Sequence, residues 1–153
     1  MVQALPKMAK EANNPKLKEA FESHLEETKG QKEKLDRVFA LLNIKHGNTK
    51  CLAMEGLIEE GKDLIDENAT PEVKDAGLIA AAQKIEHYEI SGYGTVVHYA
   101  EKLGHKEIHQ LLSEILNEEK RKQTQSLMIW RKKQSIRKQW HNRQCSFKVN
   151  DLE

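Results

Sequence analysis

Paired glutamates lie in an otherwise apolar stripe in the middle of the chain. Glu86 and Glu89 are three residues apart in the segment EHYE, in line with the apolar residues Ile79 and Ala82. Because residues three or four apart share one face of a helix, both carboxylates are expected to point roughly inward. Desolvating an unpaired carboxylate costs on the order of several kcal/mol, so another group must compensate these side chains.

The same pattern recurs in two further segments. The apolar stripe of residues 15–43 passes through His24, Glu27 and Gln31, and Glu119 continues the stripe of the last predicted helix. One compensation is a pair of divalent cations at the centre of a four-helix bundle, held by glutamates and by ligands one turn apart. Iron or manganese suits a site that is rich in carboxylates. The pattern therefore predicts a candidate site for two Fe or Mn ions.

These carboxylates could also be accommodated without a metal. Lysines could neutralise them, for example Lys84 or Lys29 beside Glu86. The acids could instead face solvent, because charged runs on helices usually form solvated faces. Periodicity does not decide between lysine pairing, solvation and a metal site.

The elements that would position these residues are all predicted to be helices. Only three prolines occur, each near the start of a helix or a turn, and no strand-like alternation is present. Asn14 with Pro15, and Thr70 with Pro71, are typical of helix N-termini. The predicted helices cover 1–12, 15–43, a shorter stretch between a loop at 44–51 and a break near 68–72, 71–103, and the residues from 105 onwards.

This order of lengths predicts an all-α, ferritin-like four-helix bundle with a short helix in one long crossover. An up-and-down bundle with short loops is the alternative. Gly92 and Gly94 lie inside a predicted helix, where each costs about 1 kcal/mol relative to alanine, and this suggests close helix packing. Cys51 precedes the short helix and is expected to be a buried or half-buried thiol.

Charge is divided unevenly along the chain. Among 153 residues, 25 are Lys or Arg and 24 are Asp or Glu, which gives a formal net charge of +1. Residues 1–119 carry a net charge of −7, whereas residues 120–153 carry +8. The division predicts an acidic helical domain over 1–119 and a basic, atypical extension of the last helix over 120–153.

Several classes of protein are excluded by composition. An apolar run of about 18 residues, which a membrane-spanning helix needs, does not occur, and the start of the chain does not resemble a signal peptide. Cys51 and Cys145 are far apart and form no CxxC motif, which argues against a disulfide framework or a zinc ribbon. These features predict a cytoplasmic, reducing environment.

Three long segments carry a family resemblance: ALPKMAKEANNPKLKEAFESHLEETKGQKEKLD, KCLAMEGLIEEGKDLIDE and VKDAGLIAAAQKIEHYEISGYGT. In this order they resemble the YciE/YciF family of bacterial ferritin-like stress proteins (domain of unknown function 892), over residues 2–120. The resemblance implies a ferritin-like bundle, a homodimer, a two-metal site and a part in bacterial stress responses, although no biochemical activity is established for the family. A non-catalytic structural or protein-interaction bundle, acting as a dimer, is the alternative function.

The resemblance also implies which residues would hold the metals. Glu27 with His24 or Gln31 would serve from the second helix, Glu86 and Glu89 from EHYE, and Glu119 from NEEK; these are the candidate metal ligands His24, Glu27, Gln31, Glu86, Glu89 and Glu119. Gln31 stands where many relatives carry histidine. Relatives also have a further segment before the point matching Met1, with a glutamate expected as a ligand. The first helix is therefore expected to be incomplete and the site impaired by the loss of that carboxylate.

The carboxyl-terminal segment departs from the family in a different way. Relatives continue with a helix of the type LNDLAKKAINK, and a one-base shift of codons for that peptide gives LMIWRKKQSIR, which is residues 127–137 here. We interpret the segment as a frame-shifted form of the usual last helix. Its basic residues interleaved with Trp130, Trp140 and Phe147 also suggest, more weakly, binding to nucleic acid or to an anionic surface.

Overall fold

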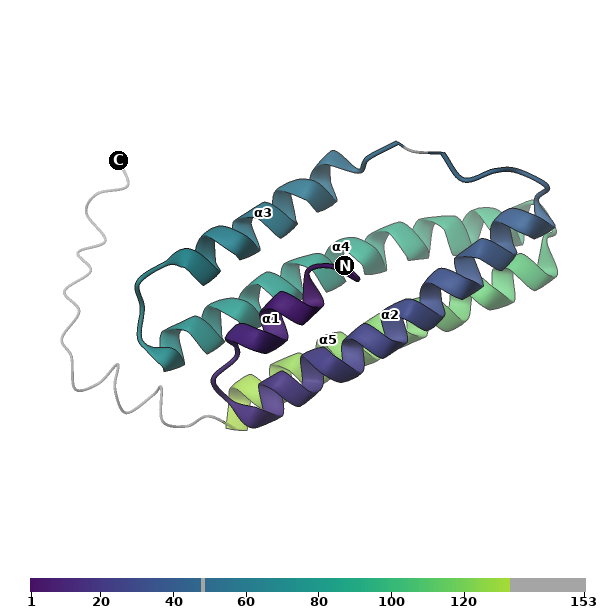
Figure 1. Ribbon diagram of the computed structural model, residues 1–153. Helices are drawn as coiled ribbons and strands as arrows, with labels where there is room; N and C mark the ends of the chain where they lie inside the picture. Colours follow the sequence, from purple (N-terminus) through teal and green to yellow (C-terminus); the bar gives the residue numbers. More distant parts are fainter. Residues whose placement is uncertain (48, 133–153) are drawn as a thin grey trace, which may run out of the picture.

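The helices of the bundle follow one another with short turns and one long crossover (Figure 1). The computed structural model describes residues 1–47 and 49–132, with side chains as far as residue 125. The helices are α1 (Leu5–Glu11), α2 (Pro15–Leu41), α3 (Leu52–Asp66), α4 (Pro71–Lys102) and α5 (Lys106–Lys132). Their order and bounds agree closely with the helices predicted from periodicity.

The three long helices α2, α4 and α5 form the body of the bundle. α5 packs against both α2 and α4, α1 packs on α2, and α3 lies along α4 within the crossover between α2 and α4 (Figure 1). The fold class is therefore confirmed as an all-α bundle with a short helix in its crossover. α1 has 7 residues, compared with 27 in α2 and 32 in α4.

Local chemistry sets the ends of the helices. Asn14 caps α2, because its side-chain oxygen accepts hydrogen bonds from the backbone N–H groups of Lys16 and Leu17 at 2.9 and 3.4 Å. Thr70 occupies the N-cap position of α4, but its side chain makes no capping hydrogen bond. Gly104 has φ +74°, a left-handed conformation that suits glycine, and it reverses the chain between α4 and α5.

Two apolar clusters fill the bundle on either side of a polar layer. One cluster contains Phe21 and Leu78, with α1 packed over it, and the other contains Val38 and Leu112 near the turn between α4 and α5. Between them, the chain buries polar side chains from three helices: His24, Gln31, Glu86, Glu119 and Lys122. The apolar clusters hold the helices together, whereas the polar layer must be stabilised by contacts of its own.

Two packing expectations are wrong. A Cβ built on Gly92 or Gly94 meets nothing within 4 Å, so neither glycine permits a close helix contact among the described residues. Cys51 is exposed rather than buried, and its Sγ lies 2.9 Å from the hydroxyl of Tyr88. Both errors arise because the neighbouring face of α4 is only partly covered.

The basic region is described only in part. α5 continues without interruption from Lys106 to Lys132, across the predicted boundary at 119, which stays a prediction. Residues 133–153 lie outside the described residues, so the proposed frame shift and the binding of nucleic acid or an anionic surface also stay predictions. Within the described part of the chain, none of the helices is both long enough and apolar enough to cross a membrane.

Candidate metal centre

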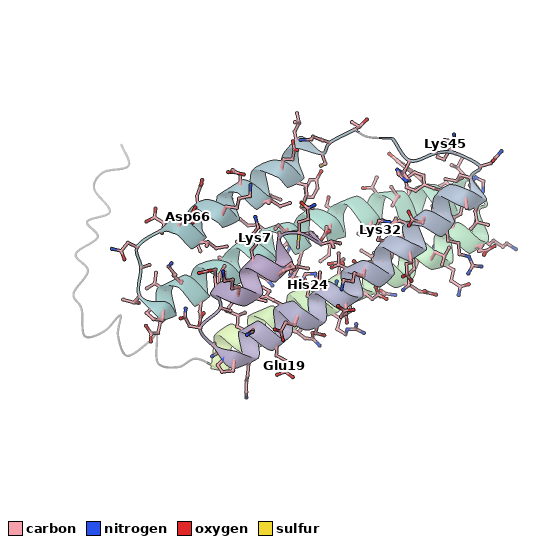
Figure 2. All side chains as sticks on the ribbon, in the orientation of Figure 1. Lys7, Glu19, His24, Lys32, Lys45 and Asp66 are labelled. Atoms are coloured by element: carbon pink, nitrogen blue, oxygen red, sulfur yellow. The ribbon has the colours of Figure 1, made fainter. Side chains whose placement is uncertain are left out.

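The six predicted ligands lie in one polar layer across α2, α4 and α5. His24, Gln31, Glu86 and Glu119 are buried, with 6%, 4%, 1% and 0% of their surface exposed. Glu27 and Glu89 are half-buried at the edge of this layer. On α2, the exposed Glu19 and Lys32 contrast with the buried His24 (Figure 2). The expectation that these polar side chains turn inward is thus met by four residues fully and by two in part.

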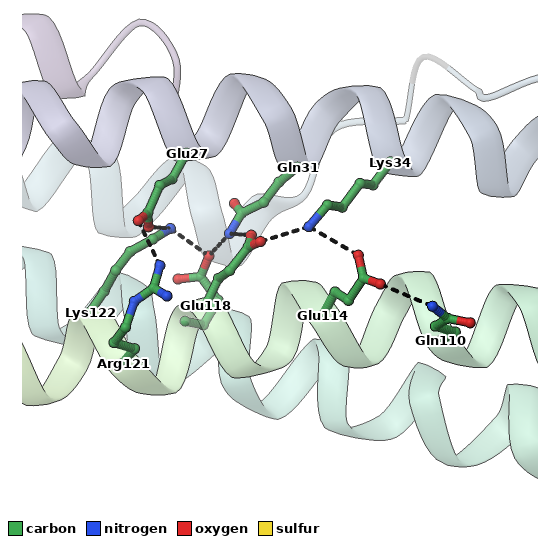
Figure 3. Close-up of polar contacts among 9 residues, drawn as sticks. Glu27, Gln31, Lys34, Gln110, Glu114, Glu118, Arg121 and Lys122 are labelled. Carbon is green, nitrogen blue, oxygen red and sulfur yellow. Dashed lines mark hydrogen bonds and ion pairs between the residues drawn. The ribbon is translucent and has the colours of Figure 1, made fainter.

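A chain of polar contacts joins α2 to α5 through Glu119. The Gln31 amide Nε2 donates to Glu119 Oε1 at 2.5 Å and to Glu118 Oε2 at 3.2 Å. The Lys122 ammonium donates to the same Glu119 oxygen at 2.9 Å (Figure 3). Glu119 Oε1 therefore accepts from two donors, one on each helix, and one of them carries a positive charge.

Glu27 is held by two cations of α5. Arg121 Nη2 donates to Glu27 Oε1 at 2.7 Å, and Lys122 Nζ lies 3.6 Å from Glu27 Oε2 (Figure 3). The Arg121 side chain is 56% exposed, whereas that of Lys122 is 5% exposed. Of these two cations, Lys122 is therefore the one that brings a positive charge into the interior, between Glu27 and Glu119.

α4 contributes the other side of the layer. Glu86 Oε2 accepts a hydrogen bond from Gln83 Nε2 at 3.0 Å, and Gln83 also donates to the backbone oxygen of Gln123 on α5 at 3.0 Å. Glu86 Oε1 lies 4.0 Å from His24 Nδ1, which is too long for a hydrogen bond. Glu86 is thus oriented by an amide on its own helix and faces the imidazole of α2.

The expected lysine partners of Glu86 bind elsewhere. The Lys84 ammonium contacts Glu60 on α3, and Lys29 pairs with Glu26 on the exposed side of α2 at 2.7 Å. Lys84 and Lys29, given above as examples of a neutralising partner for Glu86, thus contact other carboxylates. A lysine does neutralise the layer, but it is Lys122.

Burial and charge shift the ionisation of this layer. Burial, helped by the positive charges of Lys122 and the N-terminal amine, lowers the pKa of His24 to about 3. Burial, together with the negative charge of Glu119, raises the pKa of Glu89 to about 7 even though Lys122 opposes the shift. Burial also raises the pKa of the Tyr93 phenol, with Glu89 as the next cause. At neutral pH the imidazole of His24 is uncharged.

The atoms of the layer fit a metal pair only in part. Three buried atoms make no hydrogen bond with the described residues: His24 Nε2, Glu27 Oε2 and Glu119 Oε2. Carboxylate oxygens and imidazole nitrogens are the ligand atoms that a carboxylate-rich Fe or Mn site uses. Within 1–47 and 49–132, however, no three His, Cys, Asp or Glu side chains lie close enough together to share an ion. As arranged, with Lys122 bonded to Glu119, the residues do not fit the expected metal pair.

Sequence reasoning missed Lys122, Arg121 and Gln83. Lys122 follows Glu119 by three residues and therefore lies on the same face of α5, a signal that was present in the sequence. Dividing the chain by charge at residue 119 assigned this lysine to the basic extension instead. Gln83 similarly precedes Glu86 by three residues on the inner face of α4.

Comparison with known proteins places this arrangement in a family. Residues 1–136 match the family described as "Domain of unknown function (DUF892)". The chain belongs to this family. It is the YciE/YciF family that the three sequence segments resemble.

The relatives of this DUF892 protein support the assignment. Protein YciF of Escherichia coli (strain K12) is 51% identical over 121 residues, which cover 78% of this chain and 73% of YciF. The crystal structure of the E. coli stress protein YciF superposes with a TM-score of 0.81 at 48% identity, covering 84% of this chain and 81% of that one. YcfI, a proposed structural protein from Rhodopseudomonas palustris, gives a TM-score of 0.79 at 46% identity, covering 82% and 80%.

Proposed function

We propose that this DUF892 protein is a stress-response protein with a structural, non-catalytic role, acting as a homodimer. Its relatives include a stress protein from E. coli and a proposed structural protein from R. palustris. The pairing of Glu119 and Glu27 with Lys122 and Arg121 supports a non-catalytic role, because it occupies the carboxylates with the chain's own cations. The observation that carries the proposal is an apolar groove on the surface of the bundle.

The groove has a volume of about 590 Å³ and lies between α2 and α4, with Met54 of α3 at one side. Its lining is almost entirely apolar, and its exposed members include Val96, Tyr99 and Leu103, which are 40%, 59% and 72% exposed. Exposed apolar surface that is gathered in one place typically marks an interaction site. Covering it would remove this apolar area from water, which favours association.

A second copy of the chain is the partner that we propose. In a two-fold dimer the same surface patch contributes from both subunits, so the patch must be complementary to itself. An apolar groove beside the protruding side chains of Tyr99 and Leu103 supplies both a recess and groups to fill it. Glu89 is the only carboxylate among the described lining residues, and burial raises its pKa to about 7, which reduces the repulsion between like charges across such a contact.

Sedimentation velocity tests the dimer. We expect the wild-type chain to sediment as a dimer at tens of micromolar, and the double variant Val96→Asp/Leu103→Asp to sediment as a folded monomer. Val73→Asp is the matched control, because Val73 is 59% exposed on the same helix but lies outside the groove. A monomeric wild-type protein, or a double variant that stays dimeric like the control, would contradict the proposal.

A divalent-metal centre is the second candidate function. The buried atoms His24 Nε2, Glu27 Oε2 and Glu119 Oε2, which make no hydrogen bond with the described residues, favour it. Binding of Fe or Mn would require Lys122 to leave Glu119. Metal analysis of the chain purified from iron- and manganese-supplemented cells, beside a Glu86→Ala variant, tests this candidate. Metal well below one ion per chain in both proteins would remove it.

A further inference from the structure

Helix α3 is held on the bundle by few buried contacts. All of its residues are described, and none of the 15 is buried, whereas the much shorter α1 buries three of its 7 residues. The described residues that flank α3, at 42–47, 49–51 and 67–68, are exposed. Because burial of apolar surface is the main favourable term in folding, α3 adds less to the stability of the fold than its length suggests.

One stripe of α4 carries the contacts with α3 and its cap residue Cys51. The members of the stripe are spaced three or four residues apart, so they share one face of the helix. They are Lys74, Gly77, Ala81, Lys84 and Tyr88, and they face Ile65, Leu64, Gly61, Glu60 and Cys51 in that order. The last two contacts join exposed groups: Lys84 binds Glu60, and the Tyr88 hydroxyl lies 2.9 Å from Cys51 Sγ. Contacts between exposed groups contribute little to stability, because water competes for them.

Small residues make up the centre of this stripe. A Cβ built on Gly61 would lie 3.8 Å from the Cβ of Ala81, and a Cβ on Gly77 would lie 2.6 Å from Leu64 Cδ1. The two helix backbones therefore approach closely, but glycine and alanine offer little apolar area to bury. Leu64 and Ile65 pack against the apolar cluster that contains Phe21 and Leu78, and they are only half-buried. The apolar attachment of α3 thus lies mainly at its carboxyl-terminal end.

Two grooves border α3 on the surface of the bundle. One, of about 890 Å³, lies between α1 and α3 and has Ala81 and Ile85 of α4 in its lining. The other is the apolar groove of about 590 Å³, to which Cys51 and Met54 contribute. The helix that α3 chiefly packs on is α4, along which it lies (Figure 1). Movement of α3 away from α4 therefore breaks few other contacts and changes both grooves.

We propose that α3 is a detachable strap, which separates from α4 as a unit while α1, α2, α4 and α5 stay folded. The separation requires less free energy than global unfolding, because it breaks surface contacts and little apolar packing. It opens Ala81 and Ile85 to solvent and withdraws Cys51 and Met54 from the edge of the apolar groove. Control of that groove by the strap rests on the proposed dimer, whereas the separation itself takes place within one chain and does not.

Hydrogen exchange of the full-length wild-type protein, followed by mass spectrometry of its peptides, tests the separation. We expect the amides of α3 to exchange at least about a hundredfold faster than those in the middle of α4, yet more slowly than in an unfolded chain. Low concentrations of urea should accelerate exchange in α3 less steeply than in α4 and α5, because the effect of urea scales with the surface that each opening exposes.

A disulfide that locks α3 to α4 provides the matched comparison. In a Cys51→Ser/Cys145→Ser background, Gly61→Cys/Ala81→Cys places two thiols at a Cβ–Cβ separation of 3.8 Å, which suits a disulfide. Oxidation should slow exchange in α3 at least about tenfold more than exchange in α4, because the locked strap opens only with the whole bundle. The reduced form of the same variant is the control and should behave like the wild type.

Three results in the wild-type protein would overturn the proposal. The amides of α3 could share the exchange rates and urea dependence of α4 and α5, they could exchange as fast as an unfolded chain, or α1 and α2 could open together with α3. In the locked variant, equal slowing of α3 and α4 on oxidation would also contradict it. The wild-type measurement decides the matter if the disulfide variant does not fold. Because exchange is measured within each chain, its failure would leave the sedimentation test of the dimer unaffected.

Discussion

The ammonium of Lys122 lies 2.9 Å from the Glu119 carboxylate one turn earlier on α5, and both side chains are buried. Gln31 of α2 donates to the same carboxylate oxygen. The ion pair therefore links a cation and an anion of one helix to the neighbouring helix. Its strength governs both the stability of the bundle and the availability of its carboxylates.

Replacing Lys122 by alanine should destabilise the metal-free protein strongly. The change leaves Glu119 buried without its cation, and breaking a buried pair in this way typically costs about 3–5 kcal/mol. Lys120→Ala is the control, because Lys120 is exposed on the same helix. It should change the free energy of unfolding by no more than about 0.5 kcal/mol. Urea denaturation in EDTA gives both values. If both variants lost a similarly small free energy of unfolding, the Lys122–Glu119 pair would contribute little to stability.

Replacing both members of the Lys122–Glu119 ion pair should destabilise the protein less than replacing Lys122 alone. In Lys122→Met/Glu119→Gln neither an ammonium nor a carboxylate is left uncompensated, so we expect at least half of the loss seen in Lys122→Ala to be recovered. The same urea titration measures this recovery. A double variant as unstable as Lys122→Ala would mean that the lysine acts through packing rather than charge.

The neutral imidazole of His24 should make the protein sensitive to mild acid. Burial and the charge of Lys122 lower its pKa from 6.5 to about 3, so below about pH 6.5 the unfolded chain takes up a proton that the folded chain does not. This contribution to stability is complete above the unfolded pKa and is lost as the pH falls towards the folded one. Between about pH 7 and pH 5 the wild type should lose about 2 kcal/mol more than His24→Gln. Parallel pH profiles of unfolding free energy in the two proteins would contradict this.

The ionisation of Glu89 should lower the stability of the protein as the pH rises, whereas the protonation of His24 lowers it as the pH falls. Its pKa is raised from 4.5 to about 7, so its contribution to stability is greatest below the unfolded pKa and is lost as the pH rises through the folded one. Glu89→Gln keeps a neutral side chain of the same shape. The variant should gain about 2–3 kcal/mol relative to the wild type at about pH 8, and the difference should vanish near pH 4.5. Urea denaturation at several pH values checks this, and a gain that does not depend on pH would exclude ionisation as its cause.

Gly94 should be a site where alanine stabilises the protein. The position is helical and a Cβ meets nothing within 4 Å, so the gain in helix propensity, about 1 kcal/mol, is not opposed by a clash. Gly77→Ala is the contrasting variant, because its Cβ would lie 2.6 Å from Leu64 Cδ1 and 2.9 Å from Cγ. Thermal denaturation should show a higher midpoint for Gly94→Ala and no gain for Gly77→Ala. Equal effects of the two substitutions would contradict the packing argument.

The sequence predicted the helices and the polar layer well because both depend on local regularities. Periodicity located α2, α4 and α5, and the Asn14–Pro15 pair marked the start of α2 correctly. The inward positions of Glu86 and Glu119 followed from the same spacing. Whether these residues are metal ligands stays a prediction.

Some features could not be inferred from local spacing. The partner of Lys84 is Glu60, which comes close only because α3 lies along α4. The space beside Gly92 and Gly94, and the exposure of Cys51, depend on how far neighbouring helices cover α4. Such coverage results from packing between distant segments, which a single periodic stripe does not specify.

The sequence by itself determined that an amphipathic bundle would turn polar side chains of three helices towards the interior, because apolar periodicity fixes which face of each helix leaves water. The +1 net charge and the basic character of residues 120–153 gave no indication that one of those basic residues belongs to the interior. Only the tertiary structure decided which cation neutralises the layer. The packing of α5 against α2 brings Lys122 between Glu27 and Glu119, and a buried carboxylate is satisfied by the positive charge that this packing places beside it.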